Sequence, residues 1–206
     1  MRTIEKQFNL NEERLCLDFA NTAEFHISEH PVEHLNTYAD LVEWGKRKGL
    51  YDETAGDLLM AEAERHPAQA EETLQRAIRL REATYEIFAS AANNQAPTPE
   101  SLEIFNTELS RLMGSTQLSL DGEGFQMQWQ GDKAALDQML GEVLLSAIDL
   151  LTSEDLARVG QCADDRGCGW LFIDRSKNHS RQWCDMNDCG NRAKAKRHYQ
   201  KVKLSM

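Results

Sequence analysis

The chain has 206 residues, of which 41% are hydrophobic and 28% charged, as in an ordinary globular protein. With 4 Pro and 12 Gly it is neither collagen-like nor of low complexity, and no run approaches the roughly 18 apolar residues of a membrane span. Its polar start lacks the apolar segment of a secretory signal. We therefore expect a cytoplasmic protein with no membrane partner.

The formal net charge of −11 is unevenly distributed along the chain. Residues 166–206 contain ten basic and three acidic side chains, a net +7, which leaves −18 on residues 1–165. Such asymmetry predicts an acidic body joined to a basic segment that seeks a partner. We place the boundary near Arg158–Gln161, with one domain over residues 1–159 and a second over 160–206.

The body begins with a short apolar run over residues 15–20, which we interpret as a strand or turn. His26, His30 and His34 follow at intervals of four, and on a helix this spacing would stack three imidazoles on one face. Pro31 disfavours such a helix. We interpret the segment as a solvated connector, with a metal or proton-linked site as the alternative.

Apolar residues recur at helical spacing from about residue 36 to 113, which predicts a series of helices packed on a common core. Pro99 suits the first position of one of them. The candidate N-cap residues are Asn36, Thr37, Asp52 and Thr98.

The hydrophobic period changes to two over residues 117–129, where alternating apolar and polar residues flank the sequence DGEG. This pattern predicts a β-hairpin, because glycine supplies the left-handed turn conformations. A long helix is expected over 136–151, capped by Asp132, and a short restart over 154–159, capped by Ser153.

Four of the five cysteines form two pairs near the C-terminal end, with the spacing Cys162-x5-Cys168-x15-Cys184-x4-Cys189. In a reducing compartment, paired cysteines are more often metal ligands than disulfides. Four thiolates that converge on Zn²⁺ complete a tetrahedron and leave no position for water. The spacing therefore predicts a structural zinc site, and four free cysteines are the weaker alternative.

The segment around these cysteines predicts a knuckle, a hairpin and a helix. Residues 170–173 read as a strand, 181–183 as the strand that opposes it, and the residues after Cys189 as a helix rich in Ala, Lys and Arg. The aromatic rings Trp170, Phe172 and Trp183 are expected beside the ion. The predicted fold class is α+β: a mainly helical N-terminal domain with a β-hairpin, followed by a small treble-clef-like zinc finger.

Two stretches of the chain resemble known families. The run from Cys168 to Tyr199, which includes Cys189-Gly190-Asn191-Arg192, resembles the CGNR zinc finger, and LCLDFANT at 15–22 resembles the opening of the ABATE domain. The resemblance implies a bacterial stress-induced transcription regulator. The same resemblance implies that the finger binds DNA and that the ABATE domain is a sensory module.

The basic segment supplies candidate contacts for double-stranded DNA, because Lys and Arg neutralise phosphates. Asn191 and Arg192 have the chemistry to read adenine and guanine edges, or they fix the finger internally. The candidate residues are Arg175, Lys177, Arg181, Asn191, Arg192, Lys194, Lys196, Arg197 and Lys201. The alternative is a solvated helix that contacts no nucleic acid.

Other functions remain open at this point. The finger is alternatively a protein-interaction module, and the body a homodimerisation unit or a receptor for a small-molecule effector. Asp18, Asn21 and Thr22 adjoin an apolar segment and are candidate effector contacts, although such residues more often satisfy turns and caps. We expect no enzyme, because the sequence has no catalytic triad spacing, phosphate-binding glycine loop or paired-acid motif.

Overall fold

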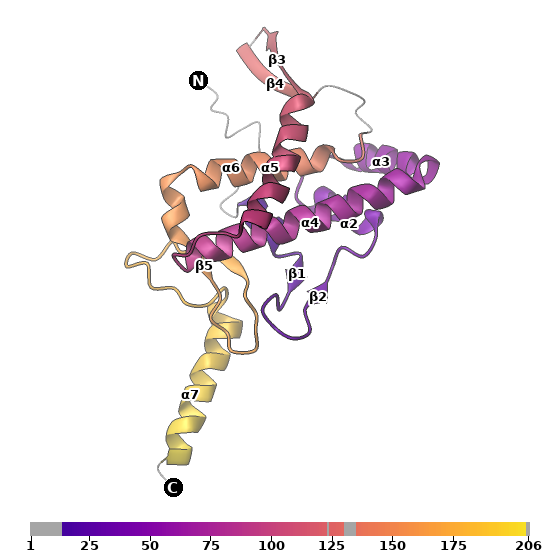
Figure 1. Ribbon diagram of the computed structural model, residues 1–206. Coiled ribbons are helices and arrows are strands. Elements are labelled where there is room, and N and C mark those ends of the chain that lie inside the picture. Colours follow the sequence, from indigo (N-terminus) through magenta and orange to yellow (C-terminus); the bar gives the residue numbers. More distant parts are fainter. Residues whose placement is uncertain (1–13, 123, 130–134, 205–206) are drawn as a thin grey trace.

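Long helices form the body of the molecule, and their apolar faces meet around α4 (Figure 1). The computed structural model describes residues 14–122, 124–129 and 135–204. The helices are α1 (Leu15–Ala20), α2 (Tyr38–Arg47), α3 (Glu53–Arg65), α4 (Pro67–Ala92), α5 (Pro99–Gly114), α6 (Gln138–Leu151) and α7 (Asn191–Leu204). None of the helices in the described residues has the length and apolarity needed to cross a bilayer.

The strands form three separate antiparallel pairs in the described part of the chain. They are β1 (Ala23–Glu24) with β2 (Val32–Glu33), β3 (Thr116–Asp121) with β4 (Gly124–Trp129), and β5 (Val159–Gln161) with β6 (Leu171–Ile173). The hairpin predicted over 117–129 is confirmed as β3 and β4. The mainly helical α+β character expected from the sequence is confirmed as well.

The helical region predicted over 36–113 is confirmed, and side chains begin its helices as expected. The Thr37 hydroxyl accepts a hydrogen bond from the Asp40 amide and Asp40 accepts one from the Thr37 amide, so Thr37 and not Asn36 is the cap. Asp52 and Thr98 cap α3 and α5 in the same manner. Each cap satisfies backbone N–H groups that have no partner within the helix.

The interpretation of residues 15–20 as a strand or turn is wrong, because they form helix α1. Cys16, Phe19 and Ala20 are completely buried, since α1 packs between α4 and α6. A short helix covered on most sides has no polar face, and its sequence therefore lacks the helical period. The connector that contains the histidines forms β1, β2 and the loop between them, where His26 stacks on Tyr85 with ring centroids 3.6 Å apart.

One further expected cap is wrong, and another falls on a residue outside the described part of the chain. Asp132 lies outside the described residues, and α6 begins at Gln138. The Ser153 hydroxyl donates back to the Leu150 carbonyl at 3.0 Å, so it does not cap the 3₁₀ turn over Glu154–Arg158. A serine between two helices can accept a hydrogen bond from an amide of the next helix or donate one to a carbonyl at the end of the preceding helix. Both kinds of backbone group lack a partner within their own helix.

The strand partner expected within the finger is also wrong. β6 pairs with β5 and not with residues 181–183, from which a single backbone bond runs between Ala163 and the Gln182 carbonyl. The choice follows from burial, because Val159 of β5 and Leu171 of β6 both belong to the core of the body. The hairpin that carries the first cysteine pair is thus built on the body itself.

Hydrogen bonds from buried side chains hold this hairpin against the helices. The Asn21 side chain, 5% exposed, donates to the Leu171 carbonyl and accepts from the Leu171 amide, both at 2.9 Å. The Tyr85 hydroxyl donates to the Gly169 carbonyl at 2.8 Å and accepts from Gln161 at 2.9 Å. These bonds join α1 and α4 to both strands.

Two glycines permit the close approach of the loop after β5 to the body. Gly167 and Gly169 have positive φ angles of 83° and 64°, in the left-handed region that glycine tolerates best. A Cβ atom at Gly167 would lie 2.7 Å from the Ser28 amide nitrogen, and one at Gly169 would lie 2.6 Å from the Tyr85 hydroxyl. Neither position has room for a side chain.

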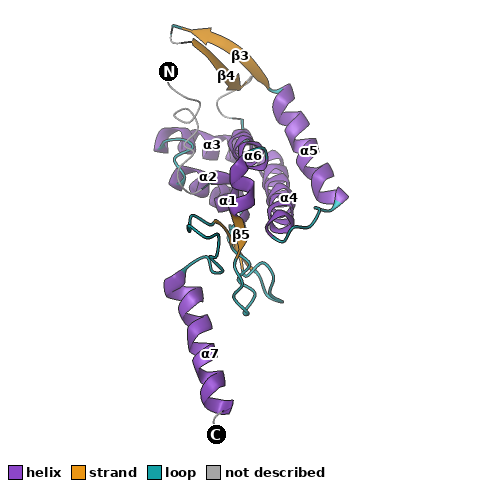
Figure 2. Ribbon diagram, turned by 90° about the vertical axis from the view of Figure 1, so that its left-hand side faces the viewer, coloured by secondary structure: helices purple, strands orange, loops and turns teal. Residues whose placement is uncertain are grey.

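Helix α7 projects away from the body at one end of the molecule (Figures 1 and 2). The β3–β4 hairpin projects at the opposite end. The body therefore separates two protruding elements, one basic and one without a basic residue.

The buried amide of Asn21 provides a test of the docking between body and finger. Asn21→Ala leaves the buried N–H and C=O of Leu171 unpaired, so we expect the free energy of unfolding to fall by about 2 to 4 kcal/mol. Urea denaturation measures it. Asn93→Ala removes an exposed 2.9 Å bond to Gln161 and should change stability by less than about 0.5 kcal/mol. Equal effects of the two substitutions would contradict the docking role.

Candidate metal centre

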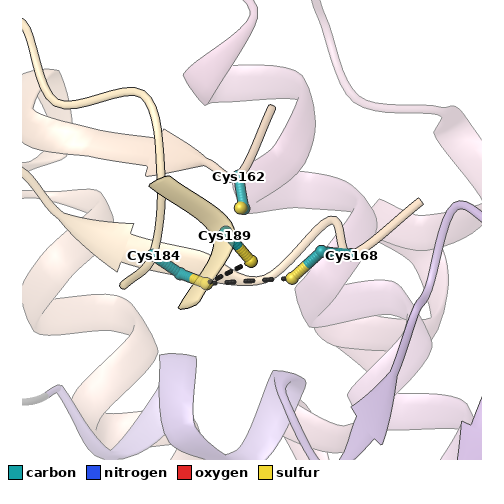
Figure 3. Close-up of side chains that lie close together, drawn as sticks. All are labelled: Cys162, Cys168, Cys184 and Cys189. Carbon is teal, nitrogen blue, oxygen red and sulfur yellow. Dashed lines mark hydrogen bonds between the residues drawn. The ribbon is translucent and has the colours of Figure 1, made fainter. Parts of the chain in front are cut away.

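The four clustered cysteines reach one point from four separate pieces of backbone (Figure 3). Cys162 directly follows β5, and Cys168 lies in the glycine-containing loop before β6. Cys184 follows the polar turn after β6, and Cys189 lies in a π-helical turn, Met186–Gly190, that leads into α7. Among the described residues, no other group of His, Cys, Asp or Glu has its ligand atoms placed to hold a metal ion.

The sulfur positions match a tetrahedral zinc site. The Sγ atoms of Cys168 and Cys184 are 3.7 Å apart, as are those of Cys184 and Cys189, and all four sulfurs lie within 4.8 Å of one another. Four sulfurs at a Zn–S distance of about 2.3 Å are separated by about 3.8 Å along each edge. The set therefore fits Zn²⁺ with four protein ligands, the arrangement of a structural site.

The thiols influence one another strongly at this distance. The neighbouring Cys184 thiol lowers the pKa of Cys168 to about 5, and the same contact raises the pKa of Cys184. Burial raises the pKa of Cys189 to about 12. Ionisation of one thiol thus disfavours ionisation of the others, because like charges repel. All four can be thiolates together only with a cation among them. Cys16 is remote and buried, and its pKa is raised to about 12 by burial.

A buried acid and an arginine surround the Cys189 sulfur. The Arg192 guanidinium donates to Cys189 Sγ at 2.9 Å and to the Asp164 carboxylate at 3.2 Å, and it also binds Asp188. Asp164 is 3% exposed and lies 3.8 Å from the same sulfur. A donor to a metal-bound thiolate reduces its negative charge and fixes its orientation. Of the two roles open for Arg192, these contacts support the internal one.

Aromatic rings enclose the cluster as expected. Phe172 is buried with the cysteines, and Trp170 and Trp183 pack against them. Arg181 lies over the Phe172 ring at 4.5 Å and donates to the carbonyls of Trp183 and Cys184. Arg181 is thus exposed to solvent and also bonded to other residues of the finger.

The other candidate nucleic-acid contacts lie on the exposed part of the finger. Asn191 donates to the Asn187 carbonyl at the start of α7, and Lys194, Lys196 and Arg197 lie along that helix, as does the backbone of Lys201. Lys196 pairs with Asp165, and Arg197 lies 5.6 Å from the Trp183 ring centre. Arg175 and Lys177 are exposed in the turn after β6.

The candidate effector contacts Asp18, Asn21 and Thr22 line a common groove of about 600 Å³. Each also has a partner within the chain. Asp18 binds Lys48 at 2.7 Å, Asn21 binds the backbone of β6, and Thr22 donates to the Phe19 carbonyl at 2.7 Å. The groove extends to Trp170, so its wall includes both the body and the finger.

Comparison with known families places this geometry in context. Residues 13–154 match the ABATE family, described as "Putative stress-induced transcription regulator". The chain belongs to the ABATE family. Residues 158–202 match the CGNR zinc finger, so the cysteine cluster of this ABATE protein is the Zn²⁺ site of that finger. Neither description names an enzyme class. No curated protein sequence matches the chain.

The sequence did not reveal Asp164 as part of the site. It is one of two adjacent acids between Cys162 and Cys168, and its neighbour Asp165 pairs with Lys196 on the surface. Nothing in their spacing distinguishes the buried acid from the exposed one. The one signal in the sequence is that a pair of acids lies between two predicted metal ligands.

Metal analysis of two cysteine variants tests the ligand set. The purified protein should contain about one zinc ion per chain, and Cys184→Ala should lose it because three sulfurs leave the tetrahedron incomplete. Cys16→Ala is the matched control and should retain zinc. The measurement is inductively coupled plasma mass spectrometry of the dialysed protein. Zinc retention by Cys184→Ala would contradict the assignment.

The contacts of Arg192 predict an effect on zinc retention. Arg192→Ala removes the donor to Cys189 Sγ, so the affinity for zinc should fall by about 10- to 100-fold. Competition with a chromophoric chelator measures this affinity. Lys194→Ala, two positions further along α7, should leave zinc affinity unchanged. A normal affinity in Arg192→Ala would show that its contacts do not support the metal.

Proposed function

We propose that this ABATE protein is a transcription regulator whose zinc finger binds double-stranded DNA through α7. One observation carries the proposal: α7 contains six basic and no acidic residues, and it stands clear of an acidic body. The division of the chain at about residue 159 belongs to the proposal, with residues 1–159 as the regulatory body and 160–206 as the DNA-binding part.

The dimensions and charge of α7 support this role. A helix of 14 residues is about 21 Å long and 10–12 Å wide with its side chains, which suits a major groove about 12 Å wide. Lys194 and Arg197 are exposed and lie three positions apart, so they occupy one side of the helix. The body, at −18 for residues 1–165, is repelled by phosphate and faces away from the duplex.

Zinc supplies the support on which α7 depends in this proposal. Cys189 is the last residue but one before the helix, so the metal fixes the starting point of α7. Arg192 and Arg181 have contacts within the finger, and we assign them to its support. Phosphate contacts are assigned to Arg175, Lys177, Lys194, Lys196, Arg197 and Lys201.

The body carries the sensory part of the proposal. The groove beside Asp18, Asn21 and Thr22 reaches Trp170, which packs against the cysteine cluster. A small polar molecule held there would contact the body and the finger together. The body is also assigned a role in forming a homodimer.

Fluorescence anisotropy with the zinc-loaded full chain and a pool of short duplexes tests DNA binding. If about five cations contact phosphates, the slope of log affinity against log salt should be about −4 to −5, and Lys194→Ala should reduce its magnitude by about 0.9. Arg79→Ala, which removes one exposed cation from α4, gives the same net charge and should bind as the parent does.

Two outcomes would overturn this function. Absence of salt-sensitive binding to any duplex rules out the DNA-binding role. Retention of an acidic protein, lost when α7 is neutralised, would then favour the protein-interaction alternative. Equal effects of Lys194→Ala and Arg79→Ala would show that α7 is not the contact surface.

A further inference from the structure

The β3–β4 hairpin presents an apolar face that nothing in the described part of the chain covers. Leu118, Leu120 and Phe125 are exposed by 70%, 69% and 74%, among the highest values for large hydrophobic residues in the described chain. Leu120 is directly opposite Phe125 in the strand register. Residues two apart share a face of a strand, so these three side chains lie on one side of the hairpin.

This hairpin lacks the support that two-stranded sheets ordinarily need. Within the described residues, β3 and β4 pair only with each other, and the hairpin projects beyond the helices (Figures 1 and 2). An isolated hairpin is marginally stable in water, and it gains stability when its apolar face packs against another layer. The exposed side chains are therefore placed to pack against a partner.

We propose that the apolar face of this hairpin is a homodimerisation surface, which packs against the same face of a second copy of the chain. The three exposed side chains amount to on the order of 400 Å² on each copy. Two such faces together bury about 800 Å², less than the roughly 1,200 Å² of a stable specific interface, so the dimer is of the weak kind that dissociates on dilution. The inference rests on the dimerising role that the proposed function gives the body.

The distribution of charge favours a second copy over other partners. The strands contain no basic residue, and Asp121 lies at the end of β3 beside the turn. Negative charge disfavours both DNA and an anionic membrane at this end of the molecule. Arg111 is an exposed base in the last turn of α5, the helix that leads into the hairpin.

A two-fold axis that lies between the two stacked hairpins, at right angles to their strands, brings these opposite charges together. Two hairpins stacked in antiparallel orientation place the turn of each copy over the base of the other, so Asp121 approaches the end of α5 that carries Arg111. The apolar faces then meet as two stacked sheets, about 10 Å apart. The same surface is used on both copies, which closes the assembly at two subunits.

Sedimentation equilibrium of the zinc-loaded full chain, without DNA, tests the proposal. The parent should shift with concentration from the 23.5 kDa of one chain toward twice that mass. Leu120→Glu and Phe125→Glu should each raise the dissociation constant at least about tenfold, because they place a charge between apolar faces. Leu58→Glu, at a 52% exposed leucine on α3, is the matched control and should dimerise as the parent does.

The remaining outcomes overturn the proposal. A parent that stays at 23.5 kDa at all concentrations would mean that the face has a different occupant, and a dimer unaffected by both hairpin substitutions would place the interface elsewhere. Circular dichroism and zinc content establish that the variants are folded, which is expected because both residues are exposed. Since DNA is absent, failure of dimerisation and failure of DNA binding are measured separately.

Discussion

The mutual repulsion of four sulfur atoms is the constraint on which the C-terminal part of the molecule depends. Their backbone segments come from four places in the chain, and few apolar residues accompany them. The thiols cannot all ionise while they are within 4.8 Å of one another unless a cation lies between them. Zn²⁺ converts this repulsion into attraction, and Asp164 and Arg192 adjust the charge around one of the ligands.

The finger is nevertheless not independent of the body. β5 follows the last helical turn of the body and forms the first strand of the metal-binding hairpin. Asn21 and Tyr85 bind the backbone of Leu171 and Gly169, just after Cys168. The metal therefore stabilises a hairpin that the helices already hold in place. The charges of the two parts, in contrast, are kept apart. α7, with six basic residues, extends from this junction away from the acidic body.

Elements with a clear period or a clear cap were predictable from the sequence. Thr37, Asp52 and Thr98 begin the helices as expected, and DGEG lies within the hairpin turn region. The ligand set was predictable because thiolate pairs have few other uses in a reducing compartment. Their spacing in the sequence carries that information directly.

Features that depend on tertiary packing were not predictable. Residues 15–20 form a helix because they are enclosed by α4 and α6, and β6 pairs with β5 because Val159 and Leu171 complete the core. Likewise, nothing local separates Asp164 from Asp165, although one is buried beside a sulfur and the other is exposed. The internal role of Arg192 depends on the same folded arrangement, since Asp164 is brought to it from a segment far from Asp188 and Cys189 in the sequence.

β5 belongs both to the core of the body and to the metal-binding hairpin, and this limits which domains the finger can be joined to. A chimaera that joined residues 162–206 to a different helical domain would lack the strand that β6 requires, together with the amide that binds Leu171. Moving α7 and its metal site to a new host would therefore require that residues 159–161 be moved with them. The host surface would also need an equivalent of Asn21. The junction makes the two family segments a matched pair and not interchangeable modules.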